Sequence, residues 1–361
     1  MTVPNPLSPE SMHQIVDEAG GVIGAIVIDS TILGPAAGGC RLWHYATDAE
    51  MTTDAKRLAR GMSYKNAMAG LPFGGGKAVL NKPLGNFDRH ALYARLGDTI
   101  EALGGQYVTA EDVGSTLADM AVVKTRTRYV SGLEARANLA GGDPSVMTAL
   151  GVYESMKLVA ETHFGLPLNG ATIAVQGTGN VGTNLCRYLR AAGAKLVIAD
   201  VDTARVAALG AELGARVVGI EEILSVEADI LAPCALGAIL NSVTIPRLSV
   251  KFVCGAANNQ LAIESDGEAL LARGIVYVPD YVVNAGGIIN ATAEYLGESD
   301  ALVRQRVDQI PARVCDVIAR AKAQNEPTSR IADAIAQSII LQRSNKLLAS
   351  GDDLGGGMSQ S

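Results

Sequence analysis

The strongest constraint on the fold is a glycine-rich turn in the second half of the chain, in the segment IAVQGTGNVGTNLCRYL (173–189). It contains the pattern Gly177-x-Gly179-x-x-Gly182, with an apolar strand predicted before it and an amphipathic helix after it. A second predicted strand ends at Asp200, 18 residues beyond Gly182. In this context the pattern predicts the phosphate-binding turn of a dinucleotide-binding domain; the alternative is a glycine-rich turn without a ligand.

Each glycine of the turn has a predicted role. Gly177 permits a tight turn, Gly179 lets the backbone approach a pyrophosphate, and Gly182 allows close packing of helix and strand. The N-terminus of the following helix favours the anion. The turn residues expected to contact the cofactor are Gly177, Thr178, Gly179, Asn180, Val181 and Gly182.

Asp200 predicts which dinucleotide binds. A carboxylate at the end of the second strand accepts hydrogen bonds from the adenosine ribose hydroxyls, and it would repel a 2′-phosphate. The sequence therefore favours NAD over NADP, although Arg205 lies nearby in the chain and leaves NADP open.

The rest of the chain alternates strand-like and helix-like segments. In the first part, strands are predicted at 21–30, 76–81 and 106–113, and helices at 47–68 and 87–105. A glycine-rich stretch at 132–144 suggests a hinge, and Asp143 is expected to cap a long helix. The later strands are predicted at 171–177, 195–200, 215–219, 228–234, 250–257 and 274–280, and a last helix at 329–350. Such alternation predicts a parallel sheet with helices on both faces.

Composition excludes several classes of protein. The 361 residues suggest two domains, and 48% hydrophobic content supplies a large core. A net charge of -7 argues against nucleic acid or an anionic membrane as the main partner. The start of the chain lacks the features of a secretion signal, and no apolar stretch is long enough to span a membrane.

Five scattered cysteines without a CxxC pair favour a reduced cytoplasmic setting, and four scattered histidines predict no metal site.

A second motif, YKNAMAGLPFGGGKAVL (64–80), places Lys65 and Lys77 on either side of a glycine-rich turn. It does not match a phosphate-binding P-loop, because Leu71 replaces the first glycine and Ala78 the hydroxyl residue. One lysine could bind a substrate carboxylate, and the other could serve in acid–base chemistry with a lowered pKa. Asp112, in TAEDVGS, could move protons to and from an amine. The alternative is that these three are surface charges.

With these motifs the chain resembles the glutamate/leucine/phenylalanine/valine dehydrogenase family, and its apolar-substrate branch, including leucine dehydrogenase, is the most similar. Seven segments carry the resemblance in order: LGPAAGGCR (33–41), the lysine segment (64–79), TAEDVGS (109–115), QGTGNVG (176–182), LAPCALGAILN (231–241), CGAANNQL (254–261) and PDYVVNAGG (279–287). One departure is visible: LNKP follows the lysine strand, where the family often has Asp-Pro. This change affects a turn rather than the chemistry.

The resemblance implies NAD-dependent, reversible oxidative deamination of an L-amino acid to a 2-oxo acid and ammonia. By motif position, Lys77 polarises the substrate carbonyl or activates water, Lys65 holds the α-carboxylate, and Asp112 transfers protons. Gly38 and Gly39 let the backbone approach the substrate. Residues implied near the cofactor are Arg41, Thr148, Ala256, Asn258 and Asn284, and Asn258 is also implied near the substrate.

The resemblance also implies the pocket for the substrate side chain. Its lining residues are Ala37, Met62, Ala110, Ile288 and Ala291. Ala37 stands where glutamate-specific members carry a lysine, and Ala291 where they carry a serine, so a glutamate γ-carboxylate would be buried unpaired. A branched aliphatic amino acid is expected first. Phenylalanine or another large apolar amino acid is second, because leucine-type members commonly have larger residues at both alanines.

We therefore expect an α/β protein of two domains with a cleft between them. An N-terminal α/β catalytic domain spans 1–134 and is rejoined by 329–361; a Rossmann-type, doubly wound NAD-binding domain spans 135–328. Family members are homo-oligomers. Two rival functions remain at this point: a hydroxy-acid dehydrogenase, which would need a histidine–carboxylate pair, and a non-catalytic NAD-binding regulator, which would not need Lys65, Lys77 and Asp112 together.

Overall fold

The computed structural model describes residues 10–132, 139–235 and 237–350, which form two units, each built around its own sheet. Unit 1 comprises 1–143, 288–303 and 336–361, and unit 2 comprises 144–287 and 304–335. The predicted boundaries (1–134 with 329–361, and 135–328) differ from this division chiefly at 288–303, which packs with unit 1. Residues 133–138 of the predicted hinge lie outside the described residues.

Unit 1 holds a five-stranded mixed sheet in the order β1-β2-β4-β3-β5. Strands β3, β4 and β5 run parallel, whereas β1, β2 and β4 are antiparallel neighbours. The sheet and the first helices of this unit are β1 (Ser11–Val16), β2 (Val22–Ser30), β3 (Ala36–Trp43), α1 (Asp48–Ala69), β4 (Gly74–Asn81), α2 (Arg89–Ala102), β5 (Tyr107–Glu111) and α3 (Leu117–Lys124).

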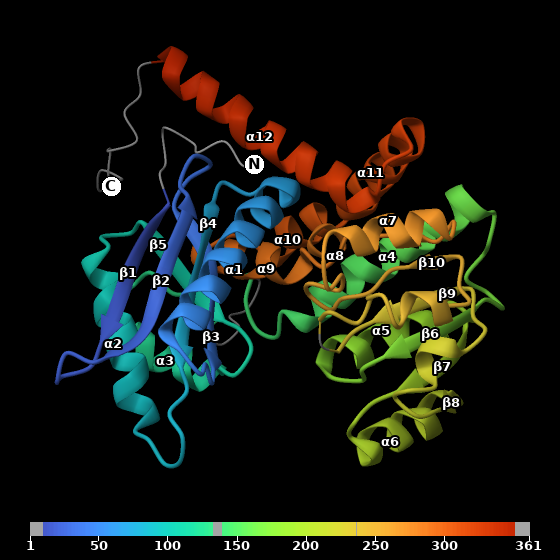
Figure 1. Ribbon diagram of the computed structural model, residues 1–361, viewed down its shortest axis with the longest axis horizontal. Coiled ribbons are helices and arrows are strands. Elements are labelled where there is room, and N and C mark those ends of the chain that lie inside the picture. Colours follow the sequence, from blue (N-terminus) through green and yellow to red (C-terminus); the bar gives the residue numbers. More distant parts are fainter. Residues whose placement is uncertain (1–9, 133–138, 236, 351–361) are drawn as a thin grey trace. The chain divides into compact units, whose positions relative to one another are not determined.

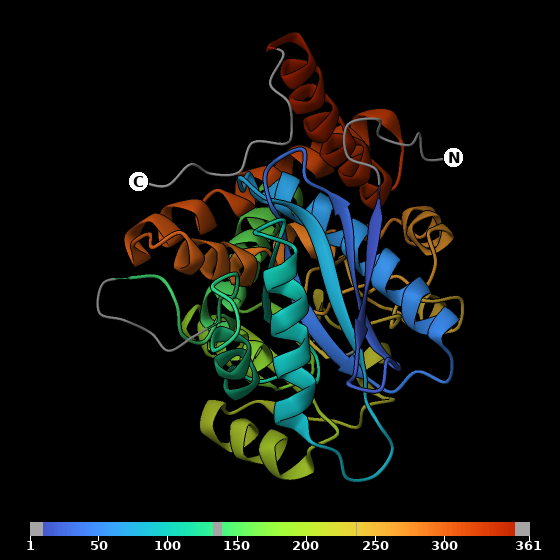
Figure 2. The same ribbon diagram turned by 90° about the vertical axis from the view of Figure 1, so that its left-hand side faces the viewer.

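Helices cover both faces of this sheet. Met51, Ala55 and Leu58 of α1 pack with Val27 and Val79 on one face. Residues of α2 and α3 pack on the other, in a cluster that also contains Cys40, Ala78 and Tyr107. In Figure 1, α1 crosses the sheet on one side while α2 and α3 lie on the other, and Figure 2 shows α2, in cyan, from its own side.

Helix α1 has clear sequence signals at both ends. The side chain of Thr47 accepts a hydrogen bond from the backbone N–H of Glu50, which caps the N-terminus. Gly70 ends the helix in the left-handed conformation, with φ of 69°. With the helix ends fixed by these two caps, Lys65 lies in the last turns of α1, and β4 begins a few residues later.

Unit 2 contains a six-stranded sheet in which every pair of neighbours is parallel, in the order β11-β10-β9-β6-β7-β8. This is the doubly wound order of dinucleotide-binding folds, with its reversal point between β6 and β9. The elements are α4 (Ser145–Phe164), β6 (Thr172–Gln176), α5 (Asn180–Ala191), β7 (Lys195–Ala199), α6 (Thr203–Leu213), β8 (Arg216–Val217), β9 (Ile230–Pro233), β10 (Phe252–Val253), α7 (Ser265–Ala272), β11 (Val276–Tyr277), α8 (Asp280–Val283) and α11 (Ile310–Gln324), with 3-10 turns at Ile223–Ser225 and Ile245–Arg247.

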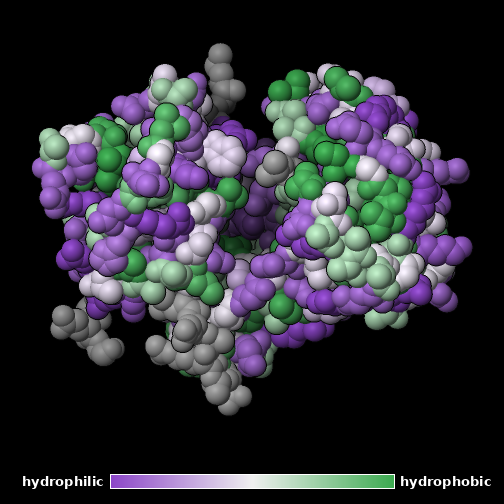
Figure 3. Space-filling model, turned by 90° about the horizontal axis from the view of Figure 1, so that it is seen from below, coloured by the Kyte–Doolittle hydropathy of each residue, from purple (hydrophilic) through white to green (hydrophobic). Residues whose placement is uncertain are grey.

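The division between the units falls within three helices: α9 (Gly286–Tyr295), α10 (Asp300–Val307) and α12 (Thr328–Ser350). One predicted cap is wrong: α4 begins after Pro144, without a side-chain capping hydrogen bond, so Asp143 is not its N-cap. Within the described ranges, no helix combines the length and low charge needed to cross a membrane. On the face drawn in Figure 3, hydrophobic residues are scattered among hydrophilic ones, as is usual for protein surfaces.

Candidate functional site

The site candidates of unit 1 lie on the parallel strands β3, β4 and β5 and on helix α1. Gly38 and Gly39 belong to β3, Lys77 to β4, and Asp112 follows β5 directly. Cys40 of β3 lies opposite Ala78 on β4 and opposite Glu111 on β5, so this register brings Gly39, Lys77 and Asp112 close together near the middle of β3 and β4. Lys65 lies on α1, the helix that packs against β4.

Lys77 and Asp112 form a buried ion pair. The Lys77 Nζ lies 2.6 Å from the Asp112 Oδ2, and only 6% and 17% of the two side chains are exposed. Burial by itself would raise the pKa of Asp112, but Lys77 and then Arg41 hold that pKa below its ordinary value. The pair therefore consists of a carboxylate and an ammonium group held in a low-dielectric environment, an arrangement suited to proton transfer.

Arg41 is a third charged member of this cluster. Its Nε lies 3.6 Å from the Asp112 Oδ2, and its Nη1 donates to the Asp54 Oδ2 at 2.9 Å. Asp54 also accepts hydrogen bonds from Tyr45 and Arg57. Arg41, which the resemblance implies near the cofactor, is thus bound to carboxylates of unit 1. Asp54 was not found from the sequence, because no motif connects it with Asp112.

The two glycines of β3 are required by close packing of the protein itself. A Cβ on Gly38 would lie 1.9 Å from the carbonyl oxygen of Gly76, and a Cβ on Gly39 would lie 2.8 Å from the Cβ of Asp112. Any larger residue would displace the strands that carry Lys77 and Asp112. From the sequence, we expected glycine here because it lets the backbone approach the substrate. The structure adds a second reason, because glycine also lets β3 approach β4 and the residues that follow β5.

The five residues predicted to line the side-chain pocket all belong to unit 1. They are Ala37, Met62, Ala110, Ile288 and Ala291, and each is buried or partly buried. Gly39 lies opposite Ala110 in the strand register. A Cβ on Gly38 would lie 3.1 Å from the Met62 Cγ, so Met62 lies next to Gly38. Ile288 and Ala291 come from α9 and belong to the segment 288–303, which packs with unit 1 although it lies far along the chain.

Asn66 is a positioning residue that the motifs did not reveal. It is fully buried, and its Nδ2 donates to the carbonyl oxygens of Gly74 at 2.6 Å and Ala37 at 3.3 Å. The side chain therefore ties the end of α1 to both β3 and β4. In the sequence, the only feature that could have pointed to this role is the position of Asn66 directly after Lys65 in a predicted helix.

In unit 2 the glycine turn has the geometry of a phosphate cradle. Gly177 has φ of +97°, and a Cβ on Gly182 would lie 2.0 Å from the carbonyl oxygen of Gly177. A Cβ on Gly179 would meet no atom within 4 Å, so the space above the turn is open. Gly179 begins α5 without a side-chain cap, which leaves the first-turn N–H groups, from Asn180 and Val181 onward, directed at that space.

Asp200 lies beside this turn. Its Oδ2 accepts hydrogen bonds from the Thr178 N–H at 2.5 Å and the Thr178 hydroxyl at 3.0 Å, and its Oδ1 accepts from Arg205 at 2.9 Å. Burial would raise the pKa of Asp200, but hydrogen bonds from the Asp202 and Thr178 N–H groups and from Arg205 lower it to about 2. The group is therefore a carboxylate at every physiological pH.

The other candidates of unit 2 cluster around Asn284. Its Nδ2 donates to the Ala256 carbonyl at 3.0 Å and to the Asn258 Oδ1 at 2.8 Å. Its own Oδ1 is buried, and among the described residues it has no hydrogen-bond partner. Thr148 donates to the Pro144 carbonyl, and its Oγ1 would lie 2.8 Å from a Cβ on Gly287. An unsatisfied buried acceptor and an open anion cradle on the same unit fit a dinucleotide that carries a carboxamide.

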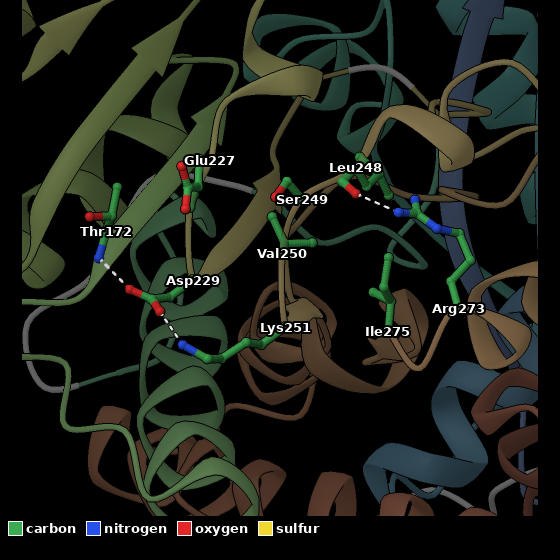
Figure 4. A pocket seen from close by; sticks show the side chains of 10 residues that line it. Thr172, Glu227, Asp229, Leu248, Ser249, Val250, Lys251, Arg273 and Ile275 are labelled. Atoms are coloured by element: carbon green, nitrogen blue, oxygen red, sulfur yellow. Dashed lines mark hydrogen bonds and ion pairs between the residues drawn. The ribbon is translucent and has the colours of Figure 1, made fainter.

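A cavity of about 560 Å³ lies elsewhere on unit 2. Its lining residues precede β6, β9, β10 and β11, so it opens at the amino ends of the strands, opposite the glycine turn. Figure 4 shows Asp229 bridging the Thr172 N–H and the Lys251 ammonium in this cavity. Ligands of doubly wound sheets bind at the carboxyl ends, so this cavity is not the candidate site.

Metal-binding clusters and disulfides are absent from the described part of the chain. No group of three His, Cys, Asp or Glu residues there is arranged to hold a metal ion. The cysteines at positions 40, 186, 234, 254 and 315 are all free thiols.

Comparison with known proteins agrees with this geometry. Residues 10–129 match the family described as Glu/Leu/Phe/Val dehydrogenase, dimerisation domain, and residues 142–213 and 206–343 match Glutamate/Leucine/Phenylalanine/Valine dehydrogenase. The chain is 45% identical to a leucine dehydrogenase of Geobacillus stearothermophilus over 90% of this chain and 88% of the relative. It is 44% identical to a valine dehydrogenase of Streptomyces albus, over 89% of each chain.

A solved structure shows the same fold. The L-tryptophan dehydrogenase from Nostoc punctiforme superposes with a TM-score of 0.80 and 36% identity, covering 93% of this chain and 96% of that chain. The matches extend through both units and include the strands that carry Lys77 and the glycine turn. The chain therefore belongs to the Glu/Leu/Phe/Val dehydrogenase family of amino acid dehydrogenases.

Proposed function

We propose that the protein catalyses the NAD-dependent oxidative deamination of a branched aliphatic L-amino acid to its 2-oxo acid and ammonia. The observation that carries this proposal is the buried Lys77–Asp112 ion pair, which lies next to Gly38 and Gly39 of the neighbouring strand β3. A non-catalytic dinucleotide-binding protein has no need of such a pair. Leucine and valine dehydrogenases among the relatives support an apolar substrate.

Each charged residue has a defined part in this proposal. Lys65 pairs with the substrate α-carboxylate. Asp112 accepts protons from the amino nitrogen and returns them to it. Lys77 activates the water whose oxygen replaces the amino group, and it polarises the carbonyl that forms. When bound, NAD would supply the hydride acceptor for the substrate α-carbon. The zwitterionic amino acid, water and NAD⁺ are consumed, and 2-oxo acid, ammonium, NADH and one proton are released, so the step balances.

The cofactor residues proposed on unit 2 follow from its geometry. The N–H groups at the start of α5 would bind the pyrophosphate, Asp200 the ribose hydroxyls, and Asn284 the carboxamide. The partly exposed Asp200–Arg205 pair supports NAD, because the arginine is held by the carboxylate rather than free for a 2′-phosphate.

We also propose that the protein works as a homo-oligomer in the cytoplasm. The match of residues 10–129 to a dimerisation domain supports assembly of copies of the chain. The free thiols support a reducing compartment.

NADH formation with a panel of substrates tests the function. Leucine, valine, isoleucine, phenylalanine, tryptophan and glutamate should be compared with the corresponding 2-hydroxy acids. We expect the branched aliphatic amino acids to give the highest kcat/KM. Activity with hydroxy acids alone, or with none of the compounds while NADH still binds, would contradict the proposal.

We expect a preference for NAD over NADP of at least about tenfold in kcat/KM, which corresponds to about 1.4 kcal/mol. Replacing Asp200 with serine should reduce the preference for NAD. The repulsion of a 2′-phosphate is then lost, and Arg205 is no longer held by the carboxylate. Asp202→Ser is the matched control, since serine keeps the helix cap that Asp202 supplies to α6. Equal use of NADP by the unaltered protein would remove the role of Asp200.

The substrate preference can be tested at the two pocket alanines. Ala37→Leu combined with Ala291→Val should penalise phenylalanine relative to valine by about tenfold or more in kcat/KM, because each methylene is worth about 1–3 kcal/mol of discrimination. NADH binding, which uses unit 2, is the control. If both substrates lose activity in equal proportion, the alanines do not line the pocket. If the wild-type enzyme does not oxidise phenylalanine, the alternative that the substrate is phenylalanine or another large apolar amino acid is discarded.

A further inference from the structure

The ladder between β3 and β4 is interrupted beside Lys77. In the register of these strands, Ala37 pairs with Gly75, and pairing resumes at Cys40 with Ala78. Gly38 and Gly39 keep their partners on β5, Thr109 and Ala110, but have none on β4. The two strands that carry the glycine pair and the lysine are therefore not joined by regular strand pairing at the position where the chemistry is proposed.

The hydroxyl of Tyr107 spans this interruption. It donates a hydrogen bond to the Gly38 carbonyl oxygen at 2.6 Å and accepts one from the Ala78 N–H at 3.0 Å. The side chain is fully buried, and a Cβ on Gly76 would lie 2.9 Å from a ring carbon of Tyr107. One phenol group thus links the backbone of β3 to the peptide that follows Lys77.

Tyr107 acts from the side of the sheet opposite to the lysine side chain. Ala78 and Tyr107 belong to the core cluster beneath α2 and α3, whereas Val79 packs with α1. Successive residues of a strand point to opposite faces, so Lys77 points to the same face as Val79. Tyr107 therefore reaches Lys77 only through its backbone and cannot act on the substrate directly.

We propose that Tyr107 is a positioning residue, which fixes Lys77 relative to the Gly38–Gly39 backbone through the Ala78 N–H. This inference rests on the proposed function, in which both strands contact one substrate. Without the hydroxyl, the Gly38 carbonyl and the Ala78 N–H lose their shared partner, and nothing in the strand register replaces it. The two strands would then separate or shift, and the lysine would move with its strand.

Tyr107→Phe tests the proposal, because it removes one oxygen atom and keeps the ring. We expect kcat with the best amino acid to fall about ten- to hundredfold, the size of effect expected from misplacing a catalytic group by about 1 Å. NADH affinity should not change. Tyr93→Phe is the matched control: Tyr93 is fully buried in the same core cluster but takes no part in the link. It should keep the wild-type kcat.

Two readouts separate positioning from general support of the fold. A purely structural hydroxyl would lower the melting temperature while leaving kcat and the amino acid KM of the folded enzyme within about twofold; that result would overturn the inference. Hydrogen exchange gives a second measure, in which the Ala78 amide should exchange faster in Tyr107→Phe and not in Tyr93→Phe. Unchanged exchange at Ala78 would also contradict the link.

The outcomes also separate this inference from the function on which it rests. If the wild-type enzyme oxidises amino acids but Tyr107→Phe matches it in kcat and KM, the positioning role alone is wrong. If the wild-type enzyme produces no NADH from any amino acid, the proposed function fails, and the positioning role fails with it.

Discussion

Replacing Lys77 with alanine is expected to lower kcat by about 10²–10⁴-fold, the contribution usual for a positioned general acid or base. The reason is geometric, because the ammonium group is buried and lies 2.6 Å from Asp112. NADH binding should persist, since the proposed dinucleotide site lies on unit 2. Steady-state kinetics and NADH titration of the same preparation measure both effects.

Lys56→Ala is the control for this variant. Lys56 lies on α1 and forms an ion pair with Glu10 at 2.6 Å, but 47% and 40% of the two side chains are exposed. Its loss should leave kcat unchanged. Retention of more than about a tenth of the wild-type kcat by Lys77→Ala would show that this lysine does not carry acid–base catalysis.

The second large effect is expected from Asp112→Asn. An amide cannot accept a proton, so kcat should fall by about 10²-fold or more. The variant also leaves the Lys77 ammonium buried without its counter-charge, which typically costs about 3–5 kcal/mol of stability. Kinetics at a temperature well below the melting point, together with thermal melting, separate the two effects.

The stability effect has a defined pH dependence. The folded-state pKa of Asp112 lies below the ordinary value of 3.8, so its charge stabilises the fold above that value. The difference in melting temperature between wild type and Asp112→Asn should be constant at pH values well above 3.8 and shrink as the pH falls through the lowered pKa. A difference that grows on acidification would show that the pKa of Asp112 is raised instead.

Asp119→Asn is the matched control for both measurements. Asp119 is buried and bound by Arg89 at 2.6 Å in the same unit, but its carboxylate completes the capping box of α3, in which Thr116 is the N-cap. We expect it to lower the melting temperature and to leave kcat unchanged. If Asp119→Asn reduces kcat as strongly as Asp112→Asn, general destabilisation rather than proton transfer explains both variants.

Local patterns predicted the elements that have strong local signals. Helix α1 follows from the spacing of Met51, Ala55 and Leu58, and the strand–turn–helix around Gly177 follows from its glycines and apolar flanks. By contrast, β1 and α3 were not predicted, and Asp143 was expected to cap α4, whose N-terminus has no side-chain cap. A cap is decided by backbone angles of a few residues, which composition alone does not determine.

The motifs indicated candidate site residues but not the hydrogen bonds that connect them to the rest of the fold. The motifs indicated Lys77, Asp112 and Asp200, because their residue types and positions carry chemistry. They did not indicate Asn66 or Tyr107, whose hydrogen bonds join residues far apart in the chain. Nor did they show that 288–303 packs with unit 1. Contacts of this kind depend on which strands become neighbours, and no local pattern contains that information.

The central claim is that the chain oxidises an apolar amino acid at its α-carbon and releases the amino group. Its most direct test is to measure NADH and ammonia together, in one reaction with wild-type enzyme, NAD and L-leucine or L-valine. The account predicts that the two products appear in equal amounts, and that both form at least about 10²-fold more slowly with Lys77→Ala. NADH formed without ammonia, or no NADH from any apolar amino acid, would contradict it.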